Sequence, residues 1–119
     1  MSIKVVSIED DGVASLAFTG EMNALEKTLD DEVGFKALLG EDWASRKVML
    51  DLGQATYMDS AAIGWLLSLH KAFDQGGGRL VLFGIEGNIQ RVIDMMRIGR
   101  VLNLSEGKAE ALARLRGKP

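Results

Sequence analysis

Two polar residues, Asp59 and Ser60, have the types and spacing that could do chemistry in this chain. They stand immediately before an apolar segment with helical spacing, where a side-chain oxygen can accept a hydrogen bond from a free helix amide. A serine hydroxyl at this position also lies near the positive end of the helix dipole, which stabilises an anion. Ser60 is therefore a candidate to carry a phosphate group, and the simpler interpretation, a helix cap, stays open beside it.

The residues after Ser60 are unusually small for the first turn of a helix. Ala61, Ala62 and Gly64 leave this turn bare, so another surface could approach it closely. Trp65 follows, and a tryptophan one turn into an amphipathic helix is expected in the core, although an exposed one would be an interface anchor. The sequence thus predicts either a modified serine or a docking surface at this helix start.

Other catalytic constellations find little support. The chain has no cysteine, and His70 is its single histidine, placed in mid-helix where it is expected at the edge of the packed face. A hydrolytic triad needs a nucleophile in contact with a base and an orienting acid, and this histidine has no such setting. The remaining carboxylates are expected on a solvated face. They are Glu26, Asp30, Asp31, Glu32, Glu41 and Asp42.

Glycine-rich segments also lack the context of a nucleotide site. A phosphate-binding loop joins a strand to the following helix, whereas Gly76–Gly78 runs from a helix into a strand. Gly84 and Gly87 do lie between a strand and a helix, but no lysine accompanies them. We therefore expect a protein that is not an enzyme and that has no cofactor or metal.

Composition limits the partners further. Hydrophobic residues make up 47% and charged residues 26% of 119 residues, the balance of one soluble domain. The formal net charge of −3 argues against direct nucleic-acid binding, which needs a dense basic face. No segment approaches the ~18 apolar residues of a membrane span, and the N-terminus lacks the apolar core of a signal peptide. These features predict a single cytoplasmic domain, residues 1–119 with a core at about 3–115, and no membrane insertion.

Strands are expected at five places. Residues 3–8 and 13–19 flank the turn Glu9–Gly12 and predict an antiparallel hairpin. Residues 47–52 form a third strand, and the continuous apolar run 79–83 is typical of a strand covered on both faces. Val101–Leu104 is a weaker fifth candidate.

Helical spacing fills the gaps between these strands. The four apolar stripes predict about four helices, the strongest at Ser60–Gln75. Alternating strands and helices predict an α/β fold with a mixed, mostly parallel sheet, right-handed crossovers and one antiparallel edge from the N-terminal hairpin. The other stripes are Leu25, Leu29, Val33 and Ala37 with Leu38 and Leu39, then Ile89, Val92, Ile93 and Met96, then Ala109, Leu112 and Leu115.

The segment around Ser60 resembles the STAS family, the sulfate-transporter and anti-sigma-factor-antagonist domain. The resemblance rests on a strand ending in Asp51-Leu52, a short loop, and then Met58-Asp-Ser-Ala-Ala-Ile-Gly-Trp-Leu-Leu67. Phe18-Thr-Gly-Glu-Met22 and Arg91–Ile98 add to it. The pattern covers nearly the whole chain in the order of elements that the family shows.

The resemblance implies a regulatory binding protein of the anti-sigma-factor-antagonist type. In such members the serine after the aspartate is the phosphoacceptor, here Ser60, and the unphosphorylated form binds an anti-sigma factor. That partner is often a serine kinase, which binds ATP and magnesium and phosphorylates the serine, so that the complex dissociates. A serine phosphatase then removes the phosphate. The implied phosphosite neighbours and partner-binding residues are Met58, Asp59, Ala61, Ala62, Gly64 and Asn23.

Two features keep an alternative open. Asn23 stands where many members have an acidic residue, and Ala61 stands where regulated members often have serine or glycine. STAS domains also serve as accessory subunits of transporters, where the same loop and helix dock a partner without phosphorylation.

Overall fold

Four strands and four α-helices follow one another in the described part of the chain. A computed structural model describes residues 2–22 and 31–117. The strands are β1 (Ser2–Ile8), β2 (Ala14–Met22), β3 (Lys47–Met58) and β4 (Arg79–Phe83). The helices are α1 (Asp31–Leu39), α2 (Ser60–Gln75), α3 (Gly87–Met96) and α4 (Lys108–Leu115), with a short 3-10 turn, η2, at Trp43–Ser45.

The sheet has the mixed topology that the sequence predicts. The strand order is β1-β2-β3-β4, with β1 antiparallel to β2 and the other two pairs parallel. The hairpin turn closes through hydrogen bonds between Glu9 and Val13 and from the Gly12 amide to the Glu9 carbonyl. Gly12 has a φ of 88°, a conformation that glycine adopts without a side-chain clash. The prediction of an N-terminal hairpin on a parallel sheet is confirmed.

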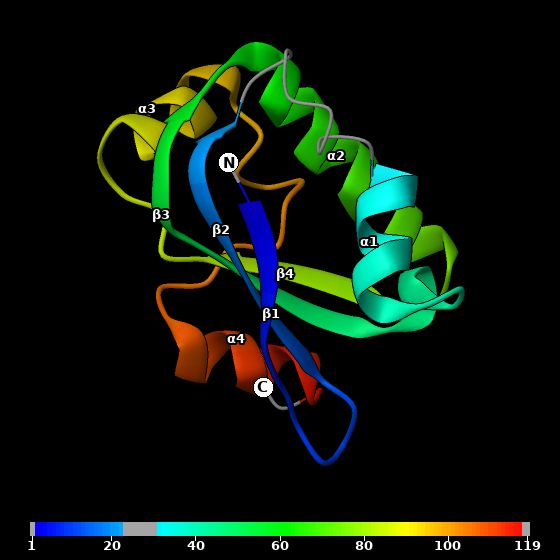
Figure 1. Cartoon of the computed structure of the whole chain (residues 1–119). Helices are drawn as coiled ribbons and strands as arrows, with labels where there is room; N and C mark the ends of the chain where they lie inside the picture. The colour runs from blue at the N-terminus through cyan, green and yellow to red at the C-terminus, as the bar shows by residue number, and fades with distance from the viewer. Residues whose placement is uncertain (1, 23–30, 118–119) are drawn as a thin grey trace.

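Helices cover both faces of this sheet, so the fold has three layers (Figure 1). Helices α1 and α2 lie on one face, and α4 lies on the other. Alternate residues of β4 enter the two cores, because side chains of a strand point to opposite faces. Leu80 and Leu82 face the α2 side, whereas Val81 and Phe83 pack with Ala111 and Leu115 of α4.

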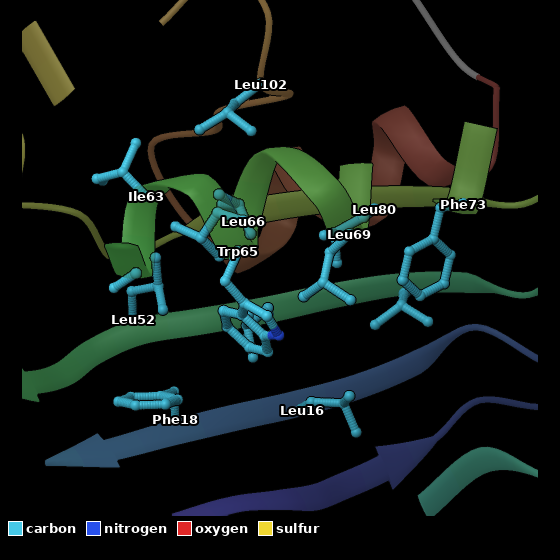
Figure 2. Close-up of a cluster of buried hydrophobic side chains, with 14 of the residues drawn as sticks. Leu16, Phe18, Leu52, Ile63, Trp65, Leu66, Leu69, Phe73, Leu80 and Leu102 are labelled. Carbon is cyan, nitrogen blue, oxygen red and sulfur yellow. The ribbon is translucent and has the colours of Figure 1, made fainter. Parts of the chain in front are cut away.

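The larger core lies between α2 and the strands, and Figure 2 shows its side chains meeting between the helix and the sheet. Trp65, Leu69 and Phe73 of α2 are buried there, as are Leu16 and Phe18 of β2. Trp65 is thus a core residue, as the helical spacing predicts. Its indole nitrogen is buried and finds no hydrogen-bond partner in the described structure.

The first helix differs in phase from its predicted stripe. Leu25 and Leu29 lie outside the described residues, and Ala37, predicted on the apolar stripe, is exposed. Phe35, which the predicted stripe did not include, is buried together with Leu39, four residues later, which the stripe did include. The Phe35 ring meets Phe73 edge-on at 5.8 Å between centroids, and this contact with the core sets the rotation of the helix.

The fifth predicted strand, Val101–Leu104, reduces to one bridge. Leu104 pairs with Leu82 alone, where β4 receives a hydrogen bond from the Ser105 amide and donates one to the Asn103 carbonyl. Val101 belongs to a turn closed onto the Ile98 carbonyl and is exposed. The apolar residues of this run divide between a turn and the core, so they do not form a strand.

The last two stripes are right in part, and each of them includes one residue that is exposed. Ile89 and Ile93 of α3 are buried, but Met96 is 41% exposed because the helix ends there. In α4 the buried residues are Ala111 and Leu115, and the predicted Ala109 is exposed.

Candidate functional site

The start of α2 is organised by Asp59. Its carboxylate Oδ1 accepts a hydrogen bond of 2.8 Å from the amide of Ala62, and its backbone is extended, with φ −100° and ψ 179°. The Asp59 carbonyl accepts the first helical bond, from the Ile63 amide at 3.1 Å. Asp59 is therefore the N-cap, which leaves the neighbouring Ser60 without a capping role.

Ser60 is the first residue of α2, and its side chain is exposed. Amides in the first turn of a helix lie outside the helical ladder, so a group attached to this hydroxyl would sit beside free donors and the positive dipole end. Ala61 and Gly64 are exposed as well. A Cβ added to Gly64 would meet nothing within 4 Å, so this part of the helix surface is open.

Two of the predicted neighbours are buried. Met58 is 4% exposed and Ala62 is fully buried against the core under α2. They lie in the core beneath the start of α2, and in this conformation they present little surface to another protein. The small size of Ala62 therefore serves the close approach of α2 to the sheet.

The carboxyl end of β2 lies beside the site. Met22 pairs with Met58, and Glu21 pairs with Tyr57, in the parallel ladder between β2 and β3. This pairing places the Gly20–Met22 segment next to the strand end that leads into Asp59. Asn23, the remaining predicted neighbour, lies outside the described residues.

His70 lies on the same helix toward its other end. It is half-buried, at the edge of the packed face where the sequence predicts it. It lines a hollow of about 360 Å³ with Asp74, Arg79 and Asn103, together with Gly78, Leu80 and Val101. None of these lining residues is a hydroxyl, thiol or amine nucleophile.

Other features of the described residues bear on the predicted absences. Across residues 2–22 and 31–117, no group of three His, Cys, Asp or Glu side chains is arranged to hold a metal ion. Within the same ranges no helix has the length and apolar character needed to cross a membrane.

Sequence reasoning missed one exposed aromatic next to the site. Tyr57, which directly precedes Met58, is 50% exposed. No sequence signal marked Tyr57, because the predicted strand ended at Leu52. In the structure β3 continues to Met58, and since side chains alternate along a strand, Tyr57 faces outward next to the buried Met58.

The family model of the STAS domain matches residues 6–111. The chain belongs to the STAS family. The match includes the end of β1, all of β2, β3 and β4, the Asp59-Ser60 segment and the first half of α4, so the site described above lies within the family domain.

Among curated proteins, this STAS domain is similar to an anti-sigma F factor antagonist from Paenibacillus polymyxa. The two are 25% identical over 68 residues, which are 57% of this chain and 58% of that relative. The alignment thus spans little more than half of the relative's length.

Three solved structures share the STAS fold. A candidate anti-sigma factor antagonist from Thermotoga maritima aligns with a TM-score of 0.78 at 24% identity, covering 92% of each chain. The Bacillus cell fate determinant SpoIIAA in its phosphorylated form aligns at 0.58 and 16% identity, covering 97% of this chain and 100% of the other. The murine anion transporter Slc26a9 aligns at 0.73 and 16% identity over 89% of this chain and 18% of the transporter. At these identities the likeness establishes the fold.

Proposed function

We propose that this STAS domain is a non-enzymatic anti-sigma factor antagonist whose binding is controlled by phosphorylation of Ser60. The unphosphorylated domain binds an anti-sigma factor at the start of α2, and phosphorylation releases it. The observation that carries the proposal is the exposed Ser60 hydroxyl on a helix N-terminus that Asp59 already caps. The Paenibacillus polymyxa relative and the phosphorylated SpoIIAA structure support it.

The phosphate is supplied by a partner with kinase activity. The Ser60 oxygen attacks the γ-phosphorus of ATP held by the kinase, an O–P bond forms, and the bond to ADP breaks. The serine proton passes to a base of the kinase. A serine phosphatase returns the hydroxyl by transferring the phosphoryl group to water. ATP and metal ions belong to these partners, and the proposal places all of them in the cytoplasm.

The helix N-terminus explains why the domain itself would tolerate the modification. Phosphorylation adds about −1.5 to −2 charges at pH 7 and three acceptor oxygens. Free amides and the helix dipole stabilise that charge at the first turn of α2. The cost therefore falls on the complex, in which the same charge would be buried against the partner.

The expected release is large. A partner packed against Ser60, Ala61 and Gly64 in the unphosphorylated complex would meet an unpaired charge, which costs several kcal/mol. Since each 1.4 kcal/mol is tenfold in affinity, we expect phosphorylation to weaken binding by about a hundredfold or more.

A second candidate is a docking domain of a transporter. The fold is shared with Slc26a9, of which the matched part is 18%. In that case the partner would be a transport protein, and a charge at Ser60 would leave binding unchanged.

The decisive experiment is affinity purification with the Ser60→Ala variant as bait, followed by identification of the retained protein by mass spectrometry. Binding of the purified partner is then measured for the wild type, Ser60→Ala, Ser60→Asp and the phosphorylated domain. We expect an anti-sigma factor that binds the wild type and Ser60→Ala equally, Ser60→Asp more weakly, and the phosphorylated domain weakest of all.

Ser68 provides the matched control, because it is an exposed serine on the same helix, two turns beyond Ser60. Ser68→Asp adds the same charge away from the helix N-terminus and should bind like the wild type. Equal affinity for the phosphorylated and unphosphorylated domains would reject the switch, and recovery of a transporter would favour the second candidate.

A further inference from the structure

A largely apolar hollow of about 290 Å³ lies between β3 and α3, beside the candidate site. Met58, at one edge of the hollow, directly precedes the N-cap Asp59. Any surface that covered the start of α2 would therefore reach this hollow with little extension. Its lining residues are Thr56, Tyr57 and Met58 from β3 and Asn88, Ile89, Arg91 and Val92 from α3.

Exposed apolar side chains lie on the two elements, β3 and α3, that line the hollow. Tyr57 is 50%, Met95 81% and Met96 41% exposed, and these are three of the six large hydrophobic residues exposed in the described structure. Met95 lies four residues after Arg91, so the two side chains share one face of α3. The inner face of α3 is already occupied, since Ile89 and Ile93 are buried in the core. Helix α3 thus carries exposed apolar side chains, at Met95 and Met96, in addition to its buried face.

The charge at the rim of the hollow is positive. Arg91 is exposed and forms no ion pair among the described residues. The neighbouring carboxylate of Asp94 instead accepts a 2.9 Å hydrogen bond from the Gln90 side chain. A free guanidinium presents a planar pair of donors that matches a carboxylate, and arginine is enriched among residues that dominate protein interfaces.

We propose that this hollow, lined in part by Tyr57 and Arg91 and continued along α3 by the exposed Met95, docks the anti-sigma factor through one apolar side chain flanked by a carboxylate. The proposal rests on the proposed function and names the chemistry of the partner's contact. The volume of the hollow is at the lower limit for a small-molecule site and gives room for an inserted side chain. Methionine side chains adapt to the shape of an inserted group, which suits a protein contact.

The position of the hollow also links docking to the switch. A phosphate on Ser60 would stand two residues along the chain from Met58, which lines the same hollow as Arg91. The phosphate and the partner's carboxylate repel each other, so modification would weaken this contact together with the contact at α2. Release would then come from both surfaces.

The test compares two variants with two matched controls. Arg91→Glu reverses the rim charge, and Met95→Asp places a charge on the exposed apolar face. Arg100→Glu reverses an exposed arginine that lines a different hollow with Ile93, Asp94 and Arg97, and Val101→Asp alters an apolar residue 52% exposed on a turn. The probe is the anti-sigma factor recovered above, purified and kept without ATP. We expect about tenfold or greater loss of affinity for the first pair and less than about twofold for the controls.

The outcomes separate this proposal from the proposed function. Normal binding by Arg91→Glu and Met95→Asp, together with weakened binding by Ser60→Asp, would overturn the proposal that the hollow docks the partner. It would leave the proposed control by Ser60 phosphorylation intact. Failure to recover any anti-sigma factor overturns both. Two further measurements test for other occupants, and either positive result would overturn the proposal. A dimer in sedimentation that Met95→Asp dissociates would assign the surface to a second copy of this chain. Binding to phosphatidylglycerol vesicles that Met95→Asp abolishes would assign it to a membrane. Thermal melts confirm that each variant folds.

Discussion

At the scale of single residues, Asp59 and Ser60 have separate roles that the sequence alone could not assign to one or the other. The Asp59 side chain accepts the Ala62 amide, and Ser60 presents its hydroxyl to solvent. Because the cap does not use Ser60, the serine can change its charge without removing the hydrogen bond that starts α2.

This division predicts that two substitutions have unequal effects on stability. Asp59→Ala should lower the free energy of unfolding by about 1 kcal/mol, because it removes a side-chain N-cap. Ser60→Ala should change it by less than about 0.5 kcal/mol, as expected of an exposed position away from such a cap. Urea unfolding followed by circular dichroism measures both.

Asp59→Asn is the control for the cap, since asparagine caps a helix as well as aspartate does. It should restore most of the stability lost in Asp59→Ala. A Ser60→Ala variant less stable than Asp59→Ala would show that the serine, and not the aspartate, is the structural residue.

The sequence predicted the start of α2 because capping residues before an apolar helix are a local pattern. It could not assign the buried side of the site. Ala62 and Met58 were expected as contact residues, and their burial depends on how α2 sits on the sheet, which is set by distant residues such as Phe18 and Leu52. The surface around Tyr57 and Met95 depends likewise on the meeting of β3 with α3, residues far apart in the chain.

At the scale of elements, the connection from α2 to β4 shows how closely segments approach. The Gly78 amide donates to the Ala44 and Phe73 carbonyls at 3.1 and 2.9 Å. A Cβ added at Gly78 would lie 2.3 Å from the Arg46 carbonyl oxygen, where no side chain fits. Because Gly78 has no side chain, this connection can pack directly against the backbone of residues 44–46, which precedes β3.

Gly78→Ala should therefore destabilise the domain by about 1–3 kcal/mol, because backbone must shift to admit the methyl group. The measurement is the free energy of unfolding in urea. Gly64→Ala is the matched control, since it lies in the interior of α2 with open space around it, and alanine is a better helix former by up to about 1 kcal/mol. Equal stability of Gly78→Ala and the wild type would show that the connection is looser than the structure has it.

The sequence predicted best those elements whose burial gives a clear apolar pattern along their whole length. Helix α2 has the predicted bounds, and β4 is apolar on both faces because helices cover both. Strand β3 was expected to end at Leu52 but continues to Met58. Its last part pairs only with β2 and is mostly exposed, so it lacks the apolar pattern that marks a strand.

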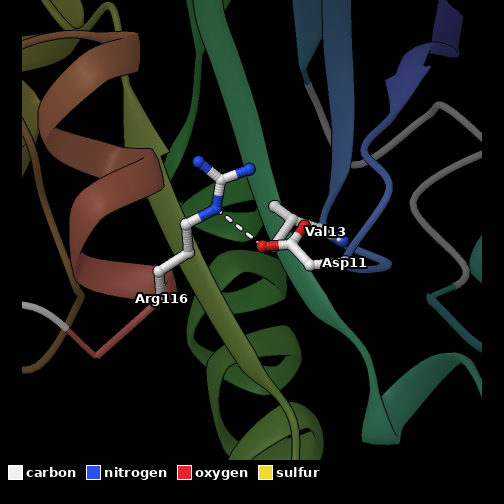
Figure 3. Close-up of polar contacts among 3 residues, drawn as sticks. All are labelled: Asp11, Val13 and Arg116. Atoms are coloured by element: carbon white, nitrogen blue, oxygen red, sulfur yellow. Dashed lines mark hydrogen bonds and ion pairs between the residues drawn. The ribbon is translucent and has the colours of Figure 1, made fainter.

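At the scale of the whole molecule, one ion pair joins the two ends of the described chain. Arg116, at the end of α4, donates from Nε to Asp11 Oδ2 in the hairpin turn at 2.6 Å, across 105 residues of sequence (Figure 3). The Arg116 hydrogen bond lowers the pKa of the Asp11 carboxyl below its ordinary 3.8, and a hydrogen bond from the Val13 amide adds to this effect. The pKa of Arg116 is raised by the same contact.

The direction of the pKa shift fixes how stability depends on pH. Because the folded pKa of Asp11 lies below its unfolded value, the pair stabilises the fold above about pH 4 and loses this effect as the pH falls through the folded pKa. Arg116→Gln should therefore be less stable than the wild type near pH 7 and equal to it in strong acid. Urea unfolding at a series of pH values measures the difference.

Arg100→Gln is the control, because Arg100 is exposed and forms no ion pair among the described residues. Its difference from the wild type should not vary with pH below neutrality in the manner of Arg116→Gln. A constant difference for Arg116→Gln from pH 7 down to strong acid would contradict the assignment of the shift to this pair.

The order of strands in the sheet is the same as their order in the chain, and this has a consequence for synthesis on the ribosome. Each strand can join the one before it as it leaves the exit tunnel, so the nascent sheet can grow without waiting for a later strand to insert. The face bearing Met49, Val81 and Phe83 is the exception, because its cover, α4, is translated after all four strands. Until α4 emerges from the ribosome, this apolar face of the sheet is uncovered and accessible to the ribosome-associated chaperones.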